Sequence, residues 1–550
     1  MKTIFHAGFV AFVALKATIL LANYPQIPTE CKHSSKERKL SQAKAMVIYM
    51  KQHWQKHIVL TVLTAGIFTS GLLTSCAGDK DALPSDDTAV KNSNTAALTE
   101  TGAEDNRLPA PAVKDMNGAE LTILNATADS FNWATTTILV EEAVGETLND
   151  ALFKREQWVE ETYHCSISET QQPNGELVSY IPKSVSAGDK TFDAAMVFDA
   201  SVSTILLKDC LLSWDEVPNL DLTTPWWDNA ATQEYNFGGI QAAVSGAYSL
   251  YNYSTRHVYV FNNKMMTDLD VDEDLYRLVR EGAWTVDKLY EIASLAVSDL
   301  NGDGKMEEET DRYGIIGTPT RHYSALLMGS GVKYIDRSED GTLYFAIPGN
   351  AHAQSVMEKF VQLDTQNTDI YTDKKADINI DIDTVFTEGR AMFCAAYVGE
   401  AAKMRSLEFD IGFVPPPKFD REQSEYYSLV EGGAQTVLPR ILDDTDLEKV
   451  GVLLNAFGYA SYYESIPAYI EVLLKEKVAR NEDSAEMLQL VFDSSAYDLG
   501  TGVWSADTKN KYVSNIFAKS SPDIASLTQK YTQAVEKQLA KFETALADLS

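Results

Sequence analysis

The stretch Phe192-Asp-Ala-Ala-Met-Val-Phe198 decides the fold of this chain. Its last five residues form a continuous apolar run, which is typical of a buried strand. Directly after it comes Asp199-Ala-Ser201, where we expect the chain to turn. A buried strand of this kind must be covered by other elements, so the surrounding sequence decides the fold class.

Elements of both kinds surround this strand. Another short strand is expected at Leu121–Leu124, and apolar residues recur at helical spacing over Thr147–Tyr163. Thr285 is expected to cap a helix that the chain enters at Trp284–Leu289. Further helices are predicted at Leu447–Tyr463, Ser465–Val478, Ser484–Phe492 and Ile524–Leu546. Strands that alternate with helices predict an α/β architecture.

Length and charge limit the number of lobes and the kind of partner. The 550 residues include 47 basic and 79 acidic side chains, which gives a net charge of −32. A surface this acidic repels phosphate backbones, so we expect no nucleic-acid partner. The part that follows Cys76 is too long for one hydrophobic core and long enough for two lobes.

An export signal that ends at a cysteine is expected near the N-terminus. Basic residues at Lys51–Lys56 precede an apolar run, Ile58–Leu73, which is too short for a dedicated membrane span. Leu73-Thr74-Ser75-Cys76 resembles the lipobox of bacterial lipoproteins, whose cysteine is acylated and becomes the first mature residue. We therefore predict a signal peptide at 50–75, lipid attachment at Cys76, and a location on the extracytoplasmic face of the cell membrane.

Two further segments are expected to lie outside the folded part. Because the signal starts naturally at Met50, residues 1–49 are interpreted as an upstream extension from a wrongly chosen start codon. The alternative for 1–49 is a first membrane segment. Residues 76–113 contain few large apolar side chains and cannot offset the entropy of ordering, so they are expected to form a flexible tether behind the lipidated cysteine.

The segment Asp299–Thr310 resembles an EF-hand calcium loop. Its expected ligands are Asp299, Asn301, Asp303, the carbonyl of Lys305, and Glu307. Gly304 allows the sharp turn, but Thr310 stands where the motif has a bidentate carboxylate. Two interpretations stay open, a structural Ca²⁺ ion and a metal-free turn rich in Asp and Asn. No other cofactor is expected.

Motifs of known enzymes are missing from the sequence. There is no GxSxG elbow, no phosphate-binding GxxxxGK[ST] loop, and no GxGxxG after a strand. The three cysteines after Cys76 are widely spaced, so neither a disulfide framework nor a CxxC metal site is expected. Paired carboxylates are too common in so acidic a chain to identify a glycosidase pair. A secreted glycan-active enzyme therefore stays open as an alternative.

Several separated stretches, taken together, point to one family. They are Gly145–Ala151 with Arg155, Phe192–Phe198, Val258–Lys264, Trp284–Leu289, Phe386–Phe393 with Tyr397, and Phe413–Lys418. Their order and spacing resemble the extracellular solute-binding lipoproteins of ABC importers, the family that includes maltose-binding protein. The resemblance implies a type II periplasmic-binding-protein-like fold, in which two discontinuous α/β lobes are joined by a hinge. Lobe one would comprise 114–250 and 380–425, and lobe two 251–379 and 426–550.

The resemblance also implies that the chain binds its ligand without changing it chemically. The chain would capture a solute in the cleft between its lobes and deliver it to ABC permease subunits. From position and chemistry, the expected ligand-binding residues are Asp199, Ser201, Trp227, Tyr248, Tyr397, Glu400 and Glu431. Aromatic faces stack on sugar rings while carboxylates bind hydroxyls, which favours an oligosaccharide or another carbohydrate.

Other solutes and roles stay open at this point. Peptides or polyamines would tolerate the same lining, and a sensor-associated binding protein would signal without transport. We expect a monomer that reaches the membrane only through its lipid.

Overall fold

The computed structural model describes residues 107–127, 136–366, 384–401, 404, 407–474, 482–517 and 523–548. The chain divides into two units, Met1–Ala103 and Glu104–Ser550, and all described residues belong to the second. The segments 1–49 and 50–75, Cys76 and most of the expected tether lie outside the described residues. Within the part of the chain that is described, no helix is long and apolar enough to span a membrane.

The first sheet has five strands in the order β2-β1-β3-β14-β4. They are β1 (Ala119–Ala126), β2 (Cys165–Gln172), β3 (Ala194–Phe198), β4 (Leu211–Leu212) and β14 (Ala434–Pro439). Strand β1 runs parallel to β2 and β3, whereas β14 runs antiparallel to β3 and β4. Every residue of β3 is buried, which confirms the predicted strand.

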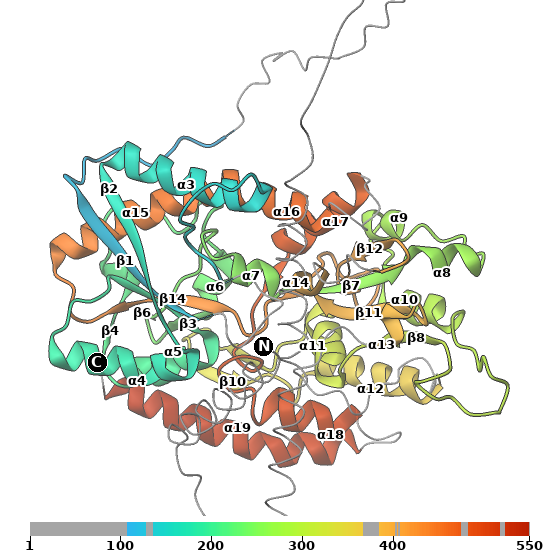
Figure 1. The fold of residues 1–550 in the computed structure, drawn as a ribbon. Coiled ribbons are helices and arrows are strands. Elements are labelled where there is room, and N and C mark those ends of the chain that lie inside the picture. The colour runs from blue at the N-terminus through green and yellow to red at the C-terminus, as the bar shows by residue number, and fades with distance from the viewer. Residues whose placement is uncertain are drawn as a thin grey trace, which may run out of the picture. The chain divides into compact units, whose positions relative to one another are not determined.

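Helices cover both faces of this sheet (Figure 1). On one face α3 (Thr147–Tyr163) packs against α15 (Asp444–Ala460), and on the other α4 (Asn174–Ala187) packs against α5 (Asp199–Leu206). The bounds of α3 are those predicted. The turn expected at Asp199–Ser201 is wrong, because a helix begins at Asp199 without an intervening loop. Aspartate is favourable both in a turn and in the first turn of a helix. The identity of residue 199 therefore did not distinguish the two structures.

The second sheet has the strand order β12-β7-β11-β8. Its strands are β7 (His257–Asn262), β8 (Tyr313–Ile316), β11 (Ala391–Tyr397) and β12 (Ile411–Val414). The helices α10 (Val286–Ser294), α11 (Pro319–Gly329) and α12 (Ala351–Gln366) accompany it. The Thr285 side chain accepts a hydrogen bond from the Lys288 N–H at the start of α10, which confirms the predicted cap.

Strand pairing corrects the expected division into lobes. Strands β11 and β12 fall in 380–425, expected in lobe one, but both pair with β7 in the second sheet. Strand β14 falls in 426–550, expected in lobe two, but it pairs with β3 in the first sheet. The sequence of a buried apolar strand does not show which sheet it joins, because its partner strand is determined by tertiary packing. The lobes are therefore discontinuous, as expected, but with other boundaries.

The remaining described elements connect and surround the two sheets. They are η2 (Trp214–Glu216), α6 (Asn229–Glu234), β5 (Asn236–Phe237), β6 (Ile240–Gln241), α7 (Leu250–Ser254), α8 (Asn263–Asp268), α9 (Leu275–Arg280), β9 (Ile335–Arg337), β10 (Leu343–Phe345), α13 (Thr384–Thr387), α14 (Val398–Ala401), β13 (Ser428–Leu429), η4 (Ser461–Ser465), α16 (Ile466–Leu474), α17 (Glu482–Asp493), β15 (Ser495–Ala496), η5 (Thr508–Val513), α18 (Ser514–Phe517) and α19 (Ile524–Ala547). The four helices predicted after residue 440 correspond to α15, α16, α17 and α19.

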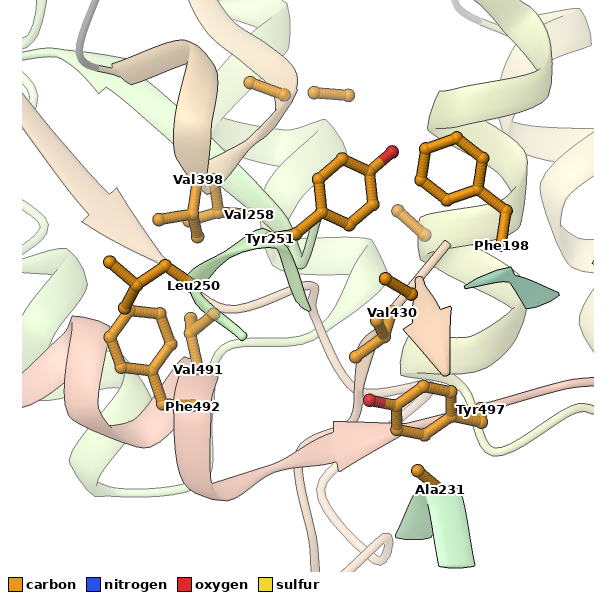
Figure 2. Close-up of a cluster of buried hydrophobic side chains, with 14 of the residues drawn as sticks. Phe198, Ala231, Leu250, Tyr251, Val258, Val398, Val430, Val491, Phe492 and Tyr497 are labelled. Carbon is orange, nitrogen blue, oxygen red and sulfur yellow. The ribbon is translucent and has the colours of Figure 1, made fainter. Parts of the chain in front are cut away.

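Apolar side chains from elements of both sheets pack into one buried cluster (Figure 2). Phe198 comes from the end of β3, Tyr251 from α7, Val258 from β7, Val398 from α14 and Phe492 from α17. The rings of Phe198 and Tyr251 lie 5.0 Å apart. Full burial of such a side chain contributes about 1.5–3 kcal/mol, so the segments that link the two sheets are held by apolar packing.

Candidate functional site

Four of the residues predicted to bind a ligand lie where strands of the two sheets end. Asp199 follows β3, Tyr397 is the last residue of β11, and Glu400 lies in α14 directly after it. Glu431 lies in the segment between β13 and β14. In open α/β sheets, ligands bind outside the carboxyl ends of the strands, which is where Asp199 and Tyr397 are placed.

Glu431 is the centre of this group. Lys509 of η5 forms an ion pair with one carboxylate oxygen, and His257 Nε2 lies 2.9 Å from the other. Burial acts to raise the pKa of Glu431, but the Lys509 charge and the His257 hydrogen bond outweigh it and hold the pKa well below its usual range. Burial lowers the pKa of His257 and outweighs the opposing effect of Glu431.

Arg321 and Glu400 form a second buried pair beside Tyr397. Arg321 Nη1 lies 2.8 Å from Glu400 Oε2, and the two side chains are 12% and 3% exposed. The same carboxylate oxygen accepts a 2.9 Å hydrogen bond from the Tyr397 backbone N–H. The guanidinium lies 4.2 Å from the centre of the Tyr397 ring, and the His257 ring meets that ring edge-on at 4.8 Å. Tyr397 is thus held between a cation and an imidazole.

Asp199 joins this group to the first sheet. Its Oδ1 accepts a 2.6 Å hydrogen bond from the Ala200 N–H, and its own N–H donates to the Gly433 carbonyl at 2.9 Å. Burial raises the pKa of Asp199 to about 6, although the Ala200 N–H hydrogen bond and the Lys509 charge act to lower it. We refer to Asp199, His257, Arg321, Tyr397, Glu400, Glu431 and Lys509 as the inter-sheet network.

The structure does not bring the other three predicted residues into this network. Tyr248 is fully buried and its ring stacks on Phe457 at 6.1 Å, so packing accounts for the residue and its contact with a ligand stays a prediction. Trp227 is also buried; its Nε1 donates to Asn455 at 3.2 Å, and it lines a different pocket. Ser201 is half-buried in α5, and its contact with a ligand stays a prediction.

Three residues of the network were missed by sequence reasoning. Arg321 could have been found, because it lies in the first turn of the helix after β8, as Asp199 does after β3. His257 and Lys509 carried no local signal. His257 opens β7, Lys509 lies in η5, and only Glu431 brings them together.

The predicted calcium loop folds around its own side-chain oxygens. The Asp299 carboxylate accepts the N–H groups of Gly302 and Gly304, at 2.6 and 2.8 Å. Both glycines have positive φ, which side chains rarely adopt. Asn301 and Asp303 each accept the N–H two residues further on.

These oxygens are of the type that calcium prefers, but the backbone N–H groups already use them. Among the described residues, no group of three or more His, Cys, Asp or Glu side chains is arranged around a metal position. Glu307 donates its backbone N–H to the Asp311 carboxylate, and Lys305 donates its own to Asp303. Calcium binding stays a prediction.

Comparison with known proteins gives a fold match and no sequence match. No protein-family model matches the chain, and no curated protein matches it. The cyclic α-maltosyl-1,6-maltose binding protein of Arthrobacter globiformis is 15% identical, with a TM-score of 0.50 over 77% of this chain and 99% of that chain. UspC of M. tuberculosis is 12% identical, with a TM-score of 0.50 over 78% of this chain and all of its own. The chain therefore has the two-lobed type II periplasmic-binding-protein fold.

Proposed function

We propose that this chain is the lipid-anchored solute-binding subunit of an ABC importer, which captures a carbohydrate between its two sheets and delivers it to the permease. The inter-sheet network carries the proposal, because it gathers charged and aromatic side chains that lie in or next to strands of both sheets. The fold supports it, since a protein with the same fold is named for binding a cyclic maltosyl-maltose.

The chemistry of the network favours a neutral solute with many hydroxyl groups. Arg321 and Lys509 supply donors, and the carboxylates of Asp199, Glu400 and Glu431 supply acceptors. These charges nearly balance, so neither a polyanion nor a polyamine gains much from the site. A hydroxyl group both donates and accepts, so an oligosaccharide can exchange partners with this network without leaving a charge unpaired.

Capture is expected to proceed through a hinge motion. Because the network includes residues from both sheets, a solute bound there contacts both lobes at once. Such a solute has a higher affinity for the closed arrangement than for an open one, and it therefore shifts the population towards closure. A permease that recognises only the closed form would then receive loaded protein.

A thermal-shift screen of the full-length chain in detergent tests the proposal. We expect oligosaccharides to raise the melting temperature, whereas peptides and polyamines leave it unchanged. Saturation at a hundred times Kd stabilises the folded state by about 2.7 kcal/mol. The same mixtures are analysed by chromatography for products. Hydrolysed glycan would favour the glycan-active enzyme, and a shift with peptides alone would overturn the carbohydrate assignment.

A pair of tyrosine variants locates the solute. Tyr397→Ala removes the aromatic face of the network and is expected to weaken oligosaccharide binding about tenfold, since stacking and burial of a ring exceed 1.4 kcal/mol. Tyr344→Ala is the matched control, because Tyr344 is 44% exposed in β10. Circular dichroism confirms that both variants fold. If both variants bind the oligosaccharide with equal affinity, the solute does not bind at the inter-sheet network.

The lipid anchor is tested separately. The lipobox-like stretch that ends at Cys76 supports it, and this stretch lies outside the described residues. Cys76→Ala is expected to release the protein from the membrane fraction or to leave its signal uncleaved. An unchanged membrane fraction would overturn the anchor without affecting solute binding. Sedimentation of the purified chain tests the proposed monomer.

A further inference from the structure

A pocket lies beside the segment that leads from α7 into β7. It has a volume of about 270 Å³. Its walls include Trp227 and Asp228 before α6, Tyr253 and Arg256 around the end of α7, Tyr462 of η4 and Asp493 of α17. None of its lining residues belongs to the inter-sheet network. We call it the Arg256 pocket.

Arg256 and Asp228 form a fixed ion pair in the lining. The Arg256 side chain is 4% exposed, and its Nη2 lies 3.3 Å from Asp228 Oδ2. Its Nε donates to Ser495 Oγ at 2.8 Å. The guanidinium lies 4.2 Å from the centre of the Tyr253 ring and 5.2 Å from that of Phe492. The contacts of Nε, of Nη2 and of the two rings hold this group before any ligand arrives, so binding here needs little reorganisation.

The charge of the lining disfavours an anion. Asp228 already neutralises Arg256. Asp493 adds a further carboxylate at the exposed rim, where it accepts a 2.8 Å hydrogen bond from Gln489 Nε2. A ligand with its own negative charge would meet this carboxylate at short range, whereas a hydroxyl group can donate to it.

The size of the pocket limits the ligand to one small ring. Its volume of about 270 Å³ is small for a binding pocket. Sites for drug-sized ligands begin at about 300 Å³. The aromatic residues Trp227 and Tyr462 offer apolar surface to the C–H groups of a ring, and the polar lining offers partners for its hydroxyls. We propose that the Arg256 pocket is a second binding site, which takes one neutral sugar ring or a polyol of that size.

This site is separate from the inter-sheet network although the two share a backbone segment. Arg256 and His257 are consecutive residues at the start of β7, and side chains of consecutive residues in extended backbone point to opposite sides. Arg256 contacts Asp228, whereas His257 contacts Glu431. Variants on one side therefore leave the contacts on the other side in place.

Calorimetric titration of the full-length chain in detergent tests the site, with D-glucose, D-galactose and myo-inositol as probes. We expect at least one probe to bind. Tyr462→Ala and Asp493→Asn should each weaken that binding about tenfold, through loss of ring contact or of a charged acceptor. Tyr463→Ala is the matched control, because Tyr463 is equally half-buried and lies outside the lining. Tyr397→Ala should also leave it unchanged.

Three results would overturn the proposal. The first is that none of the probes binds. The second is that probe binding is lost in Tyr397→Ala and kept in Tyr462→Ala. The third is that D-glucuronate binds as tightly as D-glucose. The proposed import function fails separately. If oligosaccharides do not bind while a single ring does, the import function is contradicted and the Arg256 pocket is supported. If oligosaccharides bind in a way that depends on Tyr397 and no single ring binds, the import function is supported and the Arg256 pocket is contradicted.

Discussion

Lys509 is the residue that allows Glu431 to stay charged while buried. The two side chains are 16% and 9% exposed. Lys509→Met leaves the carboxylate with only the His257 hydrogen bond, and we expect the free energy of unfolding to fall by about 3 kcal/mol. Urea denaturation measures the change. The double variant Lys509→Met with Glu431→Gln should recover most of it; a double variant no more stable than the single one would contradict this explanation.

Asp199 makes stability depend on pH in the opposite direction from a salt-bridged carboxylate. Burial raises its pKa to about 6, against about 3.9 in an unfolded chain. The folded state thus holds the proton more tightly. This contribution, at most about 3 kcal/mol, is complete below pH ~4 and is lost as the pH rises to ~6.

Asp199→Asn tests this dependence, because the amide oxygen can still accept the Ala200 N–H. We expect the variant to be more stable than the parent above pH 6 and equally stable near pH 4. Thermal melts at both pH values measure the difference. If the difference in stability between variant and parent does not change with pH, the pKa of Asp199 is the same in the folded and unfolded states, and this explanation is wrong.

At the scale of elements, the loop Asp299–Thr310 is the part whose metal content can be tested directly. If the loop binds calcium, adding Ca²⁺ after chelator treatment raises the melting temperature. At a Ca²⁺ concentration of a hundred times Kd, the folded state gains about 2.7 kcal/mol of stability. Asp303→Ala should abolish the rise, because it removes a predicted ligand. Asp340→Ala is the control, since Asp340 accepts the Thr342 N–H in an unrelated turn. No rise in the parent would favour the metal-free turn.

Elements with strong local patterns were predicted well. Helix α3 has the predicted bounds, and Thr285 caps α10 as expected, because helical periodicity and capping depend on residues close in sequence. The helix at Asp199 was missed, since Asp favours both turns and first helical turns. The predicted helix Leu447–Tyr463 ends at Ala460 because the π-helical turn η4 follows it.

At the scale of the whole molecule, an ion pair joins α6 to the segment that follows α11. Lys333, after α11, lies 2.7 Å from Glu234 of α6. If this pair favours the closed arrangement, Lys333→Met should weaken oligosaccharide binding about fivefold without changing the binding contacts themselves. Small-angle scattering of solute-free protein should show a larger radius of gyration. Glu339→Gln, at an exposed acid in the turn between β9 and β10, is a suitable control.

The sequence by itself determined the α/β class, the positions of the principal helices and strands, and four members of the network. Each of these follows from patterns within about twenty residues, or from a chemical type at a strand end. The predictions of an export signal and of a lipid anchor at the lipobox-like stretch also come from the sequence alone, because such signals need no folded context.

Only the tertiary structure decided which strands share a sheet and which cations neutralise the buried carboxylates. Strand β14 joins β3 across more than two hundred residues, and Lys509 reaches Glu431 from a separate element. Such choices depend on the total apolar surface buried and on pairing every buried charge, and these quantities exist only once the whole chain is packed.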